Sequence, residues 1–304
     1  MKVSGIESVS GGPLRQNGRP AKTALIMEGG AMRGMFTCGV TDVLMENGIP
    51  FDGAGGISAG AVFGCNVKSR QAGRAIRYNK KYCRDKRYMS LGSLLKSGDL
   101  YGAEFCYHTL PDELDVFDLA AYRANPMEFY CVASDCRTGK PVYKKLETCD
   151  GQDLIWMRAS ASMPLASHVV KIDGYELLDG GMTDSVPLRF FEGLGYNRNV
   201  VILTQPRDFR KKPASLMWLV KAALHKYPLA VQAMKNRPQV YNEETADVFA
   251  KADRGEVFVI CPEKPLGISR TEKDPDELQR VYDEGRRIAT AVLPRLRAFL
   301  GDEA

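Results

Sequence analysis

The residues Gly56-Ile57-Ser58-Ala59-Gly60 have the pattern G-x-S-x-G, and the neighbouring sequence is interpreted outward from them. This pattern is typical of a nucleophile elbow, in which a strand ends, the chain turns sharply and a helix begins, leaving a serine hydroxyl exposed at the tip. Glycines flank such a serine because a Cβ atom there would clash with the tight turn or with neighbouring strands. A glycine-rich turn with an incidental serine explains the five residues equally well, so the flanking sequence has to distinguish the two.

The flanking residues predict a strand before the serine and a helix after it. Residues 50–55 suit a short buried strand, and the small apolar residues 59–67 suit a helix packed tightly on a sheet. Further upstream, the apolar run Thr23–Met27 is typical of another buried strand and leads into the glycine-rich segment 28–34. A helix is expected over residues 35–47, with its apolar side chains on one face.

This order of elements predicts a right-handed βαβ crossover between two parallel strands. The 29–34 loop and Ser58 both follow a strand, so both are expected at the carboxyl edge of the sheet, where open α/β sheets place ligands. Unpaired N–H groups in such a loop suit an anion, either an oxyanion from an attacked ester or a phosphate. Phosphate binding is the weaker interpretation, because the Gly-Lys-Ser/Thr ending of a Walker loop is absent and Ala31 stands where a dinucleotide-binding loop needs glycine.

Composition limits the class of protein. The chain has 304 residues, 44% of them apolar, which suits one large domain or one domain with an appendage. Its net charge of +5 is too small to predict nucleic-acid binding but is compatible with docking on an anionic lipid surface. Three histidines and eight cysteines without a C-x-x-C pair argue against a zinc site and favour free thiols in a reducing cytosol. Neither a secretory signal nor a membrane-spanning run is recognised.

The middle of the chain predicts two hairpins, a helix between them and a further buried strand. These elements are expected at residues 128–133 with 141–144, 150–162, 169–172 with 175–178, and 199–204. The second hairpin ends in Asp179-Gly180-Gly181. Such a sequence after a strand is ordinarily only a turn. The functional interpretation is a carboxylate presented beside Ser58, with the two glycines letting the backbone curl around it.

Two basic segments have a structural and a functional interpretation each. Residues 66–87 are rich in Lys and Arg, and a solvated helix face is favoured over a binding site. Residues 215–234 predict a basic amphipathic helix, bent or broken at Pro228, which suits either a membrane surface or its own domain, the latter being favoured. A short helix within 111–124, a last strand at 257–261 and a helix over 274–300 complete the chain. The loops 88–125 and 206–255 are expected to shape the substrate pocket.

A nucleophilic serine needs a base. His108, His168 and His225 lie in no recognisable motif, so a structural or surface role is favoured for each. His168 is the best of the three for a triad, because it precedes the hairpin that leads to Asp179. Alternatively, a carboxylate accepts the serine proton directly in a Ser-Asp dyad, and partial burial would raise its pKa and make it a better base.

Five blocks of sequence, in this order, resemble the patatin-like phospholipases over about residues 23–205. They are Gly29-Gly30-Ala31-Met32-Arg33-Gly34, Gly56-Ile57-Ser58-Ala59-Gly60, Ala133-Ser134-Asp135 with Thr138-Gly139, Arg158-Ala159-Ser160-Ala161-Ser162-Met163-Pro164, and Asp179-Gly180-Gly181. The resemblance implies a three-layer α/β/α fold with a central, mostly parallel sheet. It also implies a Ser-Asp dyad with Ser58 as nucleophile and Asp179 as base, and no metal or cofactor.

The same resemblance assigns roles to the glycine-rich blocks. The oxyanion loop would comprise Gly29, Gly30, Ala31, Met32, Arg33 and Gly34. The elbow would include Gly56, Ile57, Ala59 and Gly60, and the turn supporting the base would include Gly180 and Gly181. Ala31 departs from the family, which often has glycine there, and its methyl group could crowd the loop or change its φ.

The sequence therefore predicts a flexible arm over 1–21, a patatin-like catalytic domain over 22–206 and a largely helical C-terminal extension over 207–304 packed on it. The expected function is that of a serine-dependent lipid acyl hydrolase acting through an acyl-enzyme. The alternatives are a lipid-binding or interaction module on the same fold and, as a third class, a nucleotide-binding enzyme. The expected partners are a lipid or acyl-ester substrate and, transiently, a membrane surface, with no nucleic acid, and the expected location is the cytoplasm or the membrane periphery.

Overall fold

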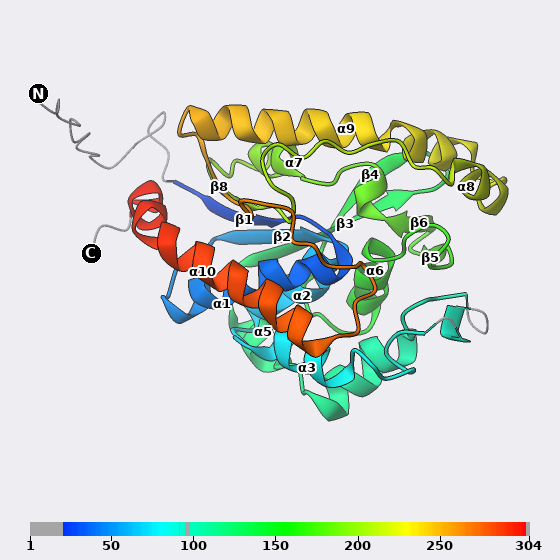
Figure 1. Ribbon diagram of the computed structural model, residues 1–304, viewed down its shortest axis with the longest axis horizontal. Coiled ribbons are helices and arrows are strands. Elements are labelled where there is room, and N and C mark those ends of the chain that lie inside the picture. The colour runs from blue at the N-terminus through cyan, green and yellow to red at the C-terminus, as the bar shows by residue number, and fades with distance from the viewer. Residues whose placement is uncertain (1–20, 91, 95–97, 302–304) are drawn as a thin grey trace, which may run out of the picture.

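A central sheet with helices on both faces forms the protein (Figure 1). The computed structural model describes residues 21–90, 92–94 and 98–301. Its strand order is β5-β6-β3-β2-β1-β7-β8, with β4 also paired to β3. The strands are β1 (Thr23–Met27), β2 (Gly53–Ile57), β3 (Glu128–Asp135), β4 (Lys140–Lys145), β5 (Val170–Ile172), β6 (Tyr175–Asp179), β7 (Arg198–Ile202) and β8 (Val257–Ile260). The pairs within β3-β2-β1-β7-β8 are parallel, so the predicted mostly parallel α/β fold is confirmed.

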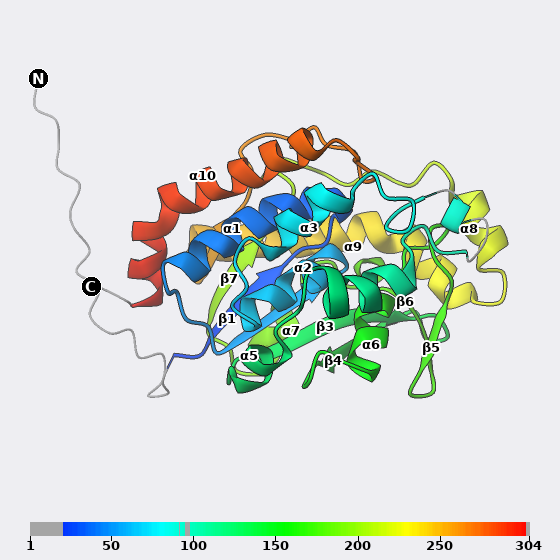
Figure 2. The same cartoon turned by 90° about the horizontal axis from the view of Figure 1, so that it is seen from below.

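The helices form a layer on each side of this sheet. They are α1 (Gly34–Glu46), α2 (Ala59–Lys68), α3 (Arg74–Tyr82), the π-helix η2 (Phe105–Leu114), α5 (Leu119–Ala124), α6 (Gln152–Ser160), α7 (Leu188–Gly193), α8 (Met217–Ala223), α9 (Pro228–Asp253) and α10 (Pro275–Leu300), with short 3-10 turns η1 (Ala31–Arg33) and η3 (Gly180–Met182). Helices α7 and α9 cover one face, and α1, α2, α3 and α10 cover the other (Figures 1 and 2).

Strand β1 shows why the sheet needs both layers. Its side chains alternate between the two faces: Leu25 and Met27 enter one core cluster, and Ala24 and Ile26 enter the other. All four are fully buried, which explains why the run is uniformly apolar rather than alternating. β1 pairs in parallel with β2, and α1 connects the two strands, which confirms the predicted βαβ unit. Both predicted hairpins, β3 with β4 and β5 with β6, are also present.

The break predicted at Pro228 in the helix over 215–234 is confirmed. α8 ends at Ala223 and α9 begins at Pro228, where proline suits the first helical position. α9 then continues through Pro238 to Asp253, well beyond the predicted end. The short helix predicted within 111–124 is confirmed as α5, which follows the end of η2.

The region after residue 206 is joined to the sheet as well as to its helices. β8 pairs in parallel with β7 and extends the sheet at that edge. Helix α10 packs closely on α1, because Gly39 and Gly285 lie in the contact: a Cβ atom on Gly39 would be 2.0 Å from the Tyr282 carbonyl oxygen, and one on Gly285 would be 2.1 Å from that of Phe36. At the other end of the chain, the predicted arm lies outside the described residues except for residue 21.

Two further features concern the whole chain. No helix in the described part of the chain combines the length and apolarity needed to cross a bilayer. The eight cysteines are all free thiols, and six of them are buried. Cys65 and Cys149 face the cavity described below.

Candidate active site

Ser58 lies at the sharp turn between β2 and α2. Its backbone has φ 55° and ψ −122°, a strained conformation for a residue with a side chain. The flanking glycines are steric requirements of this turn: a Cβ atom on Gly56 would lie 2.1 Å from the Gly60 carbonyl oxygen, and one on Gly60 would lie 2.3 Å from that of Met27. A strand, a strained serine and a helix in this order have the geometry of a nucleophile elbow.

Asp179 ends β6 and lies beside Ser58. The Ser58 side chain interacts with the Asp179 carboxylate and lowers its pKa, and the Gly181 N–H donates a hydrogen bond to that carboxylate at 2.8 Å. The backbone of the aspartate is held too, since the Ser134 hydroxyl donates to its carbonyl oxygen at 2.8 Å and its N–H donates to the Ser162 carbonyl oxygen at 2.8 Å. The structure therefore brings the predicted nucleophile and the predicted base together, with their side chains in contact.

The pKa of Asp179 is raised above the ordinary value of an aspartate. Burial is the largest cause, because the carboxylate is removed from water. The positive charge of Arg237 and the hydrogen bonds from Ser58 and Gly181 oppose this rise without cancelling it. A carboxylate with a raised pKa is a stronger base than one in water, which is what removal of a serine proton needs.

The glycine-rich loop after β1 lies directly against the elbow. A Cβ atom on Gly29 would be 2.7 Å from the Ile57 carbonyl oxygen and 2.9 Å from the Ser58 Cβ. The N–H groups of Gly29, Gly30 and Ala31 find no backbone acceptor among the described residues. Unpaired N–H groups beside a serine are suited to an oxyanion.

Not every predicted residue of this loop has a free N–H group. The Arg33 N–H donates to the Gly30 carbonyl oxygen, and the Gly34 N–H donates to that of Ala31, so both serve the η1 turn. Ala31 has φ 49°, in the left-handed region that favours glycine. Its methyl group is therefore accommodated at the expense of backbone strain.

Ser160 is a functional candidate that sequence reasoning did not single out. It lies at the end of α6, fully buried, and its hydroxyl oxygen accepts a hydrogen bond from the Ser58 N–H at 3.1 Å. The block Arg158-Ala159-Ser160-Ala161-Ser162 had drawn attention only as part of a resemblance. The Ser160 side chain holds the elbow, and the backbone carbonyl of Ser162 holds the strand end that carries Asp179.

The histidines lie elsewhere. The His168 ring packs on Gly98, where a Cβ atom would lie 1.7 Å from the ring Cε1. The backbone N–H of His168 donates to the Asp99 carboxylate at 3.0 Å. His108 and His225 are exposed. Among the described residues, no hydrogen bond joins a histidine to Ser58 or Asp179.

Ser58 opens into a cavity of about 360 Å³. Ala31 and Met32 of the loop lie at the same opening, and the walls come from α2, α3, η2 and α6. The lining is mainly apolar and includes Phe63, Leu110, Phe117, Leu154 and Met157. Residues from the 88–125 region line this cavity as expected. The 206–255 region contributes none of the lining, and the C-terminal extension reaches the cavity through Arg270 and Thr271 instead.

Comparison with known proteins agrees with this geometry. The sequence matches the Patatin-like phospholipase family over residues 25–191, which is more than half of the chain. The chain belongs to this family. Membership supports activity as a lipid hydrolase. A second match, over residues 227–301, is to a domain of unknown function, DUF6363.

The relatives of this patatin-like protein differ in length. It is 27% identical over 298 residues to the uncharacterized protein YjjU of Escherichia coli, covering 94% of this chain and 81% of the relative. It is 26% identical over 249 residues to lysophospholipase nte1 of Aspergillus fumigatus, covering 79% of this chain but only 14% of that protein. Among solved structures, VipD from Legionella pneumophila gives a TM-score of 0.46 at 13% identity, covering 90% of this chain and 67% of that one.

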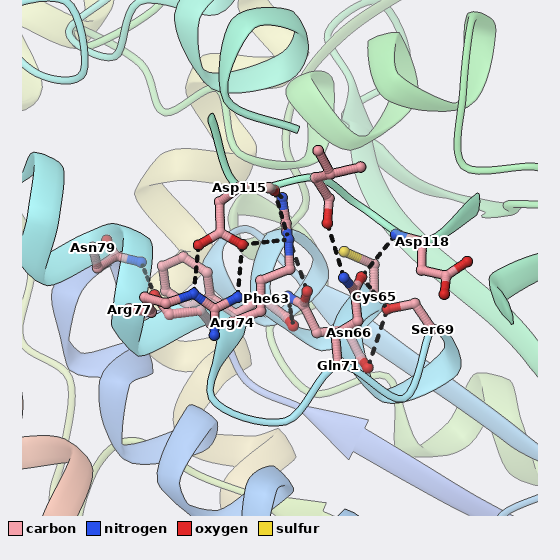
Figure 3. A network of polar contacts seen from close by, with 12 residues as sticks. Phe63, Cys65, Asn66, Ser69, Gln71, Arg74, Arg77, Asn79, Asp115 and Asp118 are labelled. Atoms are coloured by element: carbon pink, nitrogen blue, oxygen red, sulfur yellow. Dashed lines mark hydrogen bonds and ion pairs between the residues drawn. The ribbon is translucent and has the colours of Figure 1, made fainter. Parts of the chain in front are cut away.

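A buried ion network supports the cavity wall of this patatin-like protein (Figure 3). Arg74 lines the cavity, and its guanidinium pairs with Asp115 at 3.4 Å and donates to Asn66 Oδ1 at 3.2 Å. Arg77 also donates to the Asp115 carboxylate at 2.7 Å. The network holds the loop after η2 against α2 and α3. Most of the basic side chains in the 66–87 segment are exposed, as the favoured solvated face predicts. Arg74 and Lys68 are exceptions, since they are 4% and 7% exposed.

Proposed function

We propose that this protein is a serine-dependent lipid acyl hydrolase of the phospholipase A, lysophospholipase or esterase type, using Ser58 and Asp179 as a dyad. One observation carries the proposal: a serine at a strained elbow lies beside the buried Asp179 carboxylate, which it contacts through its side chain, at the opening of an apolar cavity. The unpaired N–H groups of the neighbouring loop support it, because an attacked ester needs donors for its oxyanion.

The reaction proceeds in two halves. Ser58 attacks the ester carbonyl while Asp179 takes the hydroxyl proton, and the N–H groups of the 29–31 loop stabilise the negative charge on the carbonyl oxygen. The C–O bond to the alcohol then breaks, the alcohol leaves with the proton from Asp179, and an acyl-enzyme remains on Ser58. In the second half Asp179 takes a proton from water, the water oxygen attacks the acyl carbonyl, and the fatty acid leaves as Ser58 regains its proton.

The apolar cavity is the site for the acyl chain in this scheme. Its walls of Phe63, Leu110, Phe117, Leu154 and Met157 remove apolar carbon from water, which favours a long acyl group over acetate. Because the cavity starts at Ser58, a chain that fills it places its ester carbonyl at the dyad.

The proposal is tested by ester turnover with matched single variants. Ser58→Ala is expected to abolish hydrolysis of a long-chain p-nitrophenyl ester without unfolding the protein. Asp179→Asn is expected to lower kcat at least a hundredfold, since general-base catalysis contributes about 10²–10⁴-fold. His168→Ala is the control and is expected to retain turnover. Turnover retained by Ser58→Ala, or lost from a stably folded His168→Ala, would contradict the dyad.

The proposal includes transient contact of α8 with an anionic membrane surface. Helix α8 and its flanks expose a group of apolar residues, Leu216, Trp218 and Leu229, with Trp218 66% exposed. Exposed lysines surround them, namely Lys212, Lys221 and Lys226. Exposed tryptophan and leucine rimmed by lysine complement anionic headgroups over an apolar interior. We call these six residues the α8 surface.

A further inference from the structure

Three of the eight cysteines line the apolar cavity that opens at Ser58. Cys65 lies on α2, Cys106 lies on η2, and Cys149 lies in the loop before α6. The proposed hydrolysis uses none of these thiols, and aliphatic side chains would line an acyl site equally well. Their presence in one cavity wall therefore needs an explanation of its own.

Two of these thiols are in direct contact. The side chains of Cys65 and Cys149 interact with each other, although the two residues are far apart in the sequence. Cys65 Sγ also donates to the Val62 carbonyl oxygen at 3.2 Å, which fixes its direction on α2. Cys65 and Cys149 are 5% and 3% exposed. A disulfide between them would link α2 to the loop before α6 within the cavity wall.

The backbone of Cys149 is strained. Its φ of 58° lies in the left-handed region, which a residue with a side chain rarely occupies. The Asp153 carboxylate at the start of α6 holds this conformation, because it accepts hydrogen bonds from the Thr148 N–H at 2.7 Å and the Cys149 N–H at 3.0 Å. Strain that the surrounding structure maintains is typical of functional positions. Here the strained loop carries the second thiol of the pair.

The two thiols of the pair differ in acidity. The Cys149 thiol lowers the pKa of Cys65 below the ordinary value, and the positive charge of Arg74 acts in the same direction, although burial opposes both. Contact with Cys65 and burial raise the pKa of Cys149. Arg74 shares its charge with Asp115 and contacts Asn66, which follows Cys65 on α2 (Figure 3). Cys65 therefore loses its proton first, and its thiolate is the nucleophilic form.

Cys106 is the third thiol of the wall and lacks this activation. Its Sγ donates to the Tyr88 carbonyl oxygen at 3.7 Å. Burial raises its pKa to about 12, so it stays protonated at neutral pH, where a thiol is a poor nucleophile. The same cavity wall thus contains one pair that is suited to oxidation and one thiol that is a matched control.

The cavity determines which oxidants reach the pair. Because Cys65 and Cys149 are buried and both line the cavity, an oxidant approaches their sulfur atoms from inside it. The walls are mainly apolar and include Phe63, Phe117 and Met157, so an apolar chain enters the cavity more favourably than a small polar peroxide does. An acyl chain that carries a hydroperoxide group would bring its O–O bond to the thiols.

We propose that Cys65 and Cys149 form a redox-active dithiol, which reduces the hydroperoxide of an oxidised fatty acyl chain in the apolar cavity and becomes a disulfide. The Cys65 thiolate attacks the distal peroxide oxygen and the O–O bond breaks. The chain leaves as the alcohol with the proton that Cys65 gave up, and a sulfenic acid forms on Cys65. The Cys149 sulfur then attacks the Cys65 sulfur, the S–O bond breaks, and the hydroxyl leaves as water with the Cys149 proton. The peroxide gains the two electrons that the thiols lose.

Oxidation is tested on the reduced wild-type protein with linoleic acid hydroperoxide. We expect one alcohol formed per protein, the loss of two of the eight free thiols, and a cross-link between Cys65 and Cys149 in the mass map. Dithiothreitol is expected to restore both thiols, as it does for a disulfide but not for a sulfinic acid. The hydroxy acid of the same chain lacks the O–O bond and is expected to leave every thiol reduced. Hydroperoxide consumption without this cross-link, or no consumption, would overturn the proposal.

Single variants separate the pair from the other thiols. Cys65→Ser is expected to lower the rate of hydroperoxide consumption at least tenfold. Cys149→Ser is expected to stop at a sulfenic acid on Cys65, which dimedone traps. Cys106→Ser is the control in the same wall and is expected to react like the wild type. A wild-type rate in folded Cys65→Ser, or equal slowing in Cys106→Ser, would contradict the assignment.

Hydrogen peroxide tests whether the cavity selects its oxidant. At equal concentration it is expected to form the cross-link at least tenfold more slowly than the lipid hydroperoxide, because it gains nothing from the apolar walls. Equal rates would overturn the role of the acyl chain. Neither Ser58 nor an ester takes part in these assays, so they do not depend on the proposed hydrolysis. Ester turnover without the cross-link would refute the thiol pair alone, and the cross-link without ester turnover would refute the hydrolase alone.

Discussion

A single hydroxyl on Ser160 connects the end of α6 to the backbone of Ser58. Ser160→Ala removes the acceptor of the Ser58 N–H, so the strained elbow loses one of its supports. Because a hydrogen bond contributes about 1 kcal/mol, we expect up to about a tenfold slower reaction of Ser58 with a fluorophosphonate. The measurement is the labelling rate of the folded variant. An unchanged rate would show that Ser160 does not position the nucleophile.

The raised pKa of Asp179 predicts how activity and stability depend on pH. The ionised carboxylate is the base, so kcat/KM is expected to fall as pH drops through its pKa, at a higher pH than the value of about 4 for an ordinary aspartate. A raised pKa in the folded state means that folding favours the protonated form. The stability from this group is therefore present at low pH and lost as pH rises through the folded-state pKa.

Asp179→Asn separates these two effects. At pH 7 the variant is expected to be more stable than the wild type, because it no longer buries a charge. Its kcat is expected to be at least a hundredfold lower. The measurement is denaturant unfolding at neutral and acid pH. A variant less stable than the wild type at pH 7 would mean that the ionised carboxylate is well compensated by Arg237, Ser58 and Gly181, contrary to the direction of its pKa.

How much of the site could be predicted follows from where each residue lies in the sequence. Ser58 and Asp179 are flanked by glycines that their sharp turns require, and such short patterns can be recognised in a sequence. Ser160 stood in a block that resembles the family but had no role assigned to it, and Arg237 and Lys211 carry no local signal. They reach the site only because α6, α9 and the segment before α8 pack around it, and that packing depends on contacts between distant parts of the chain.

Among the elements, β2 shows why boundaries were harder to predict than strands. It is the sequence Gly-Ala-Gly-Gly-Ile, which lacks the β-forming residues of an ordinary strand. Its glycines make room for neighbours, since a Cβ atom on Gly55 would lie 2.5 Å from the Phe191 ring. The strand was expected at 50–55 and occurs at Gly53–Ile57, because tertiary packing rather than propensity sets its position.

The contact between α1 and α10 predicts a large effect from one methyl group. Gly285→Ala places its Cβ 2.1 Å from the Phe36 carbonyl oxygen, so the helices must separate. We expect a loss of about 1–3 kcal/mol in the free energy of unfolding, as for overpacked cores. Gly193→Ala in α7 is the matched control, with nothing within 4 Å of the added methyl group, and is expected to be neutral or mildly stabilising. Equal stability of the two variants would contradict this close packing.

The α8 surface predicts binding to anionic vesicles. Trp218→Ala is expected to lower the fraction of protein that sediments with phosphatidylglycerol vesicles, because it removes the largest exposed apolar side chain of that surface. Leu194→Ala, at a 41% exposed residue after α7, is the control and is expected to leave sedimentation unchanged. If both variants sediment like the wild type, α8 is not the membrane contact.

At the scale of the whole molecule, the three-layer fold could be predicted because its parts occur in a fixed order that a family shares. The role of the last hundred residues could not. They supply β8 to the sheet, α10 to the face over α1 and the positive charges of Lys211 and Arg237 to the surroundings of Asp179. Local patterns predict the strand at 257–261 and the helix over 274–300, but they do not indicate what these elements pack against, because β7 and α1 lie far away in the sequence.

The central claim is that Ser58 is an activated nucleophile. The most direct measurement is labelling of the wild type, Ser58→Ala and Asp179→Asn with a fluorescent fluorophosphonate, followed by mass mapping of the modified residue. The account predicts modification of the wild type at Ser58, no labelling of Ser58→Ala and much slower labelling of Asp179→Asn. Equal labelling of Ser58→Ala, or no labelling of the folded wild type with vesicles present, would contradict it.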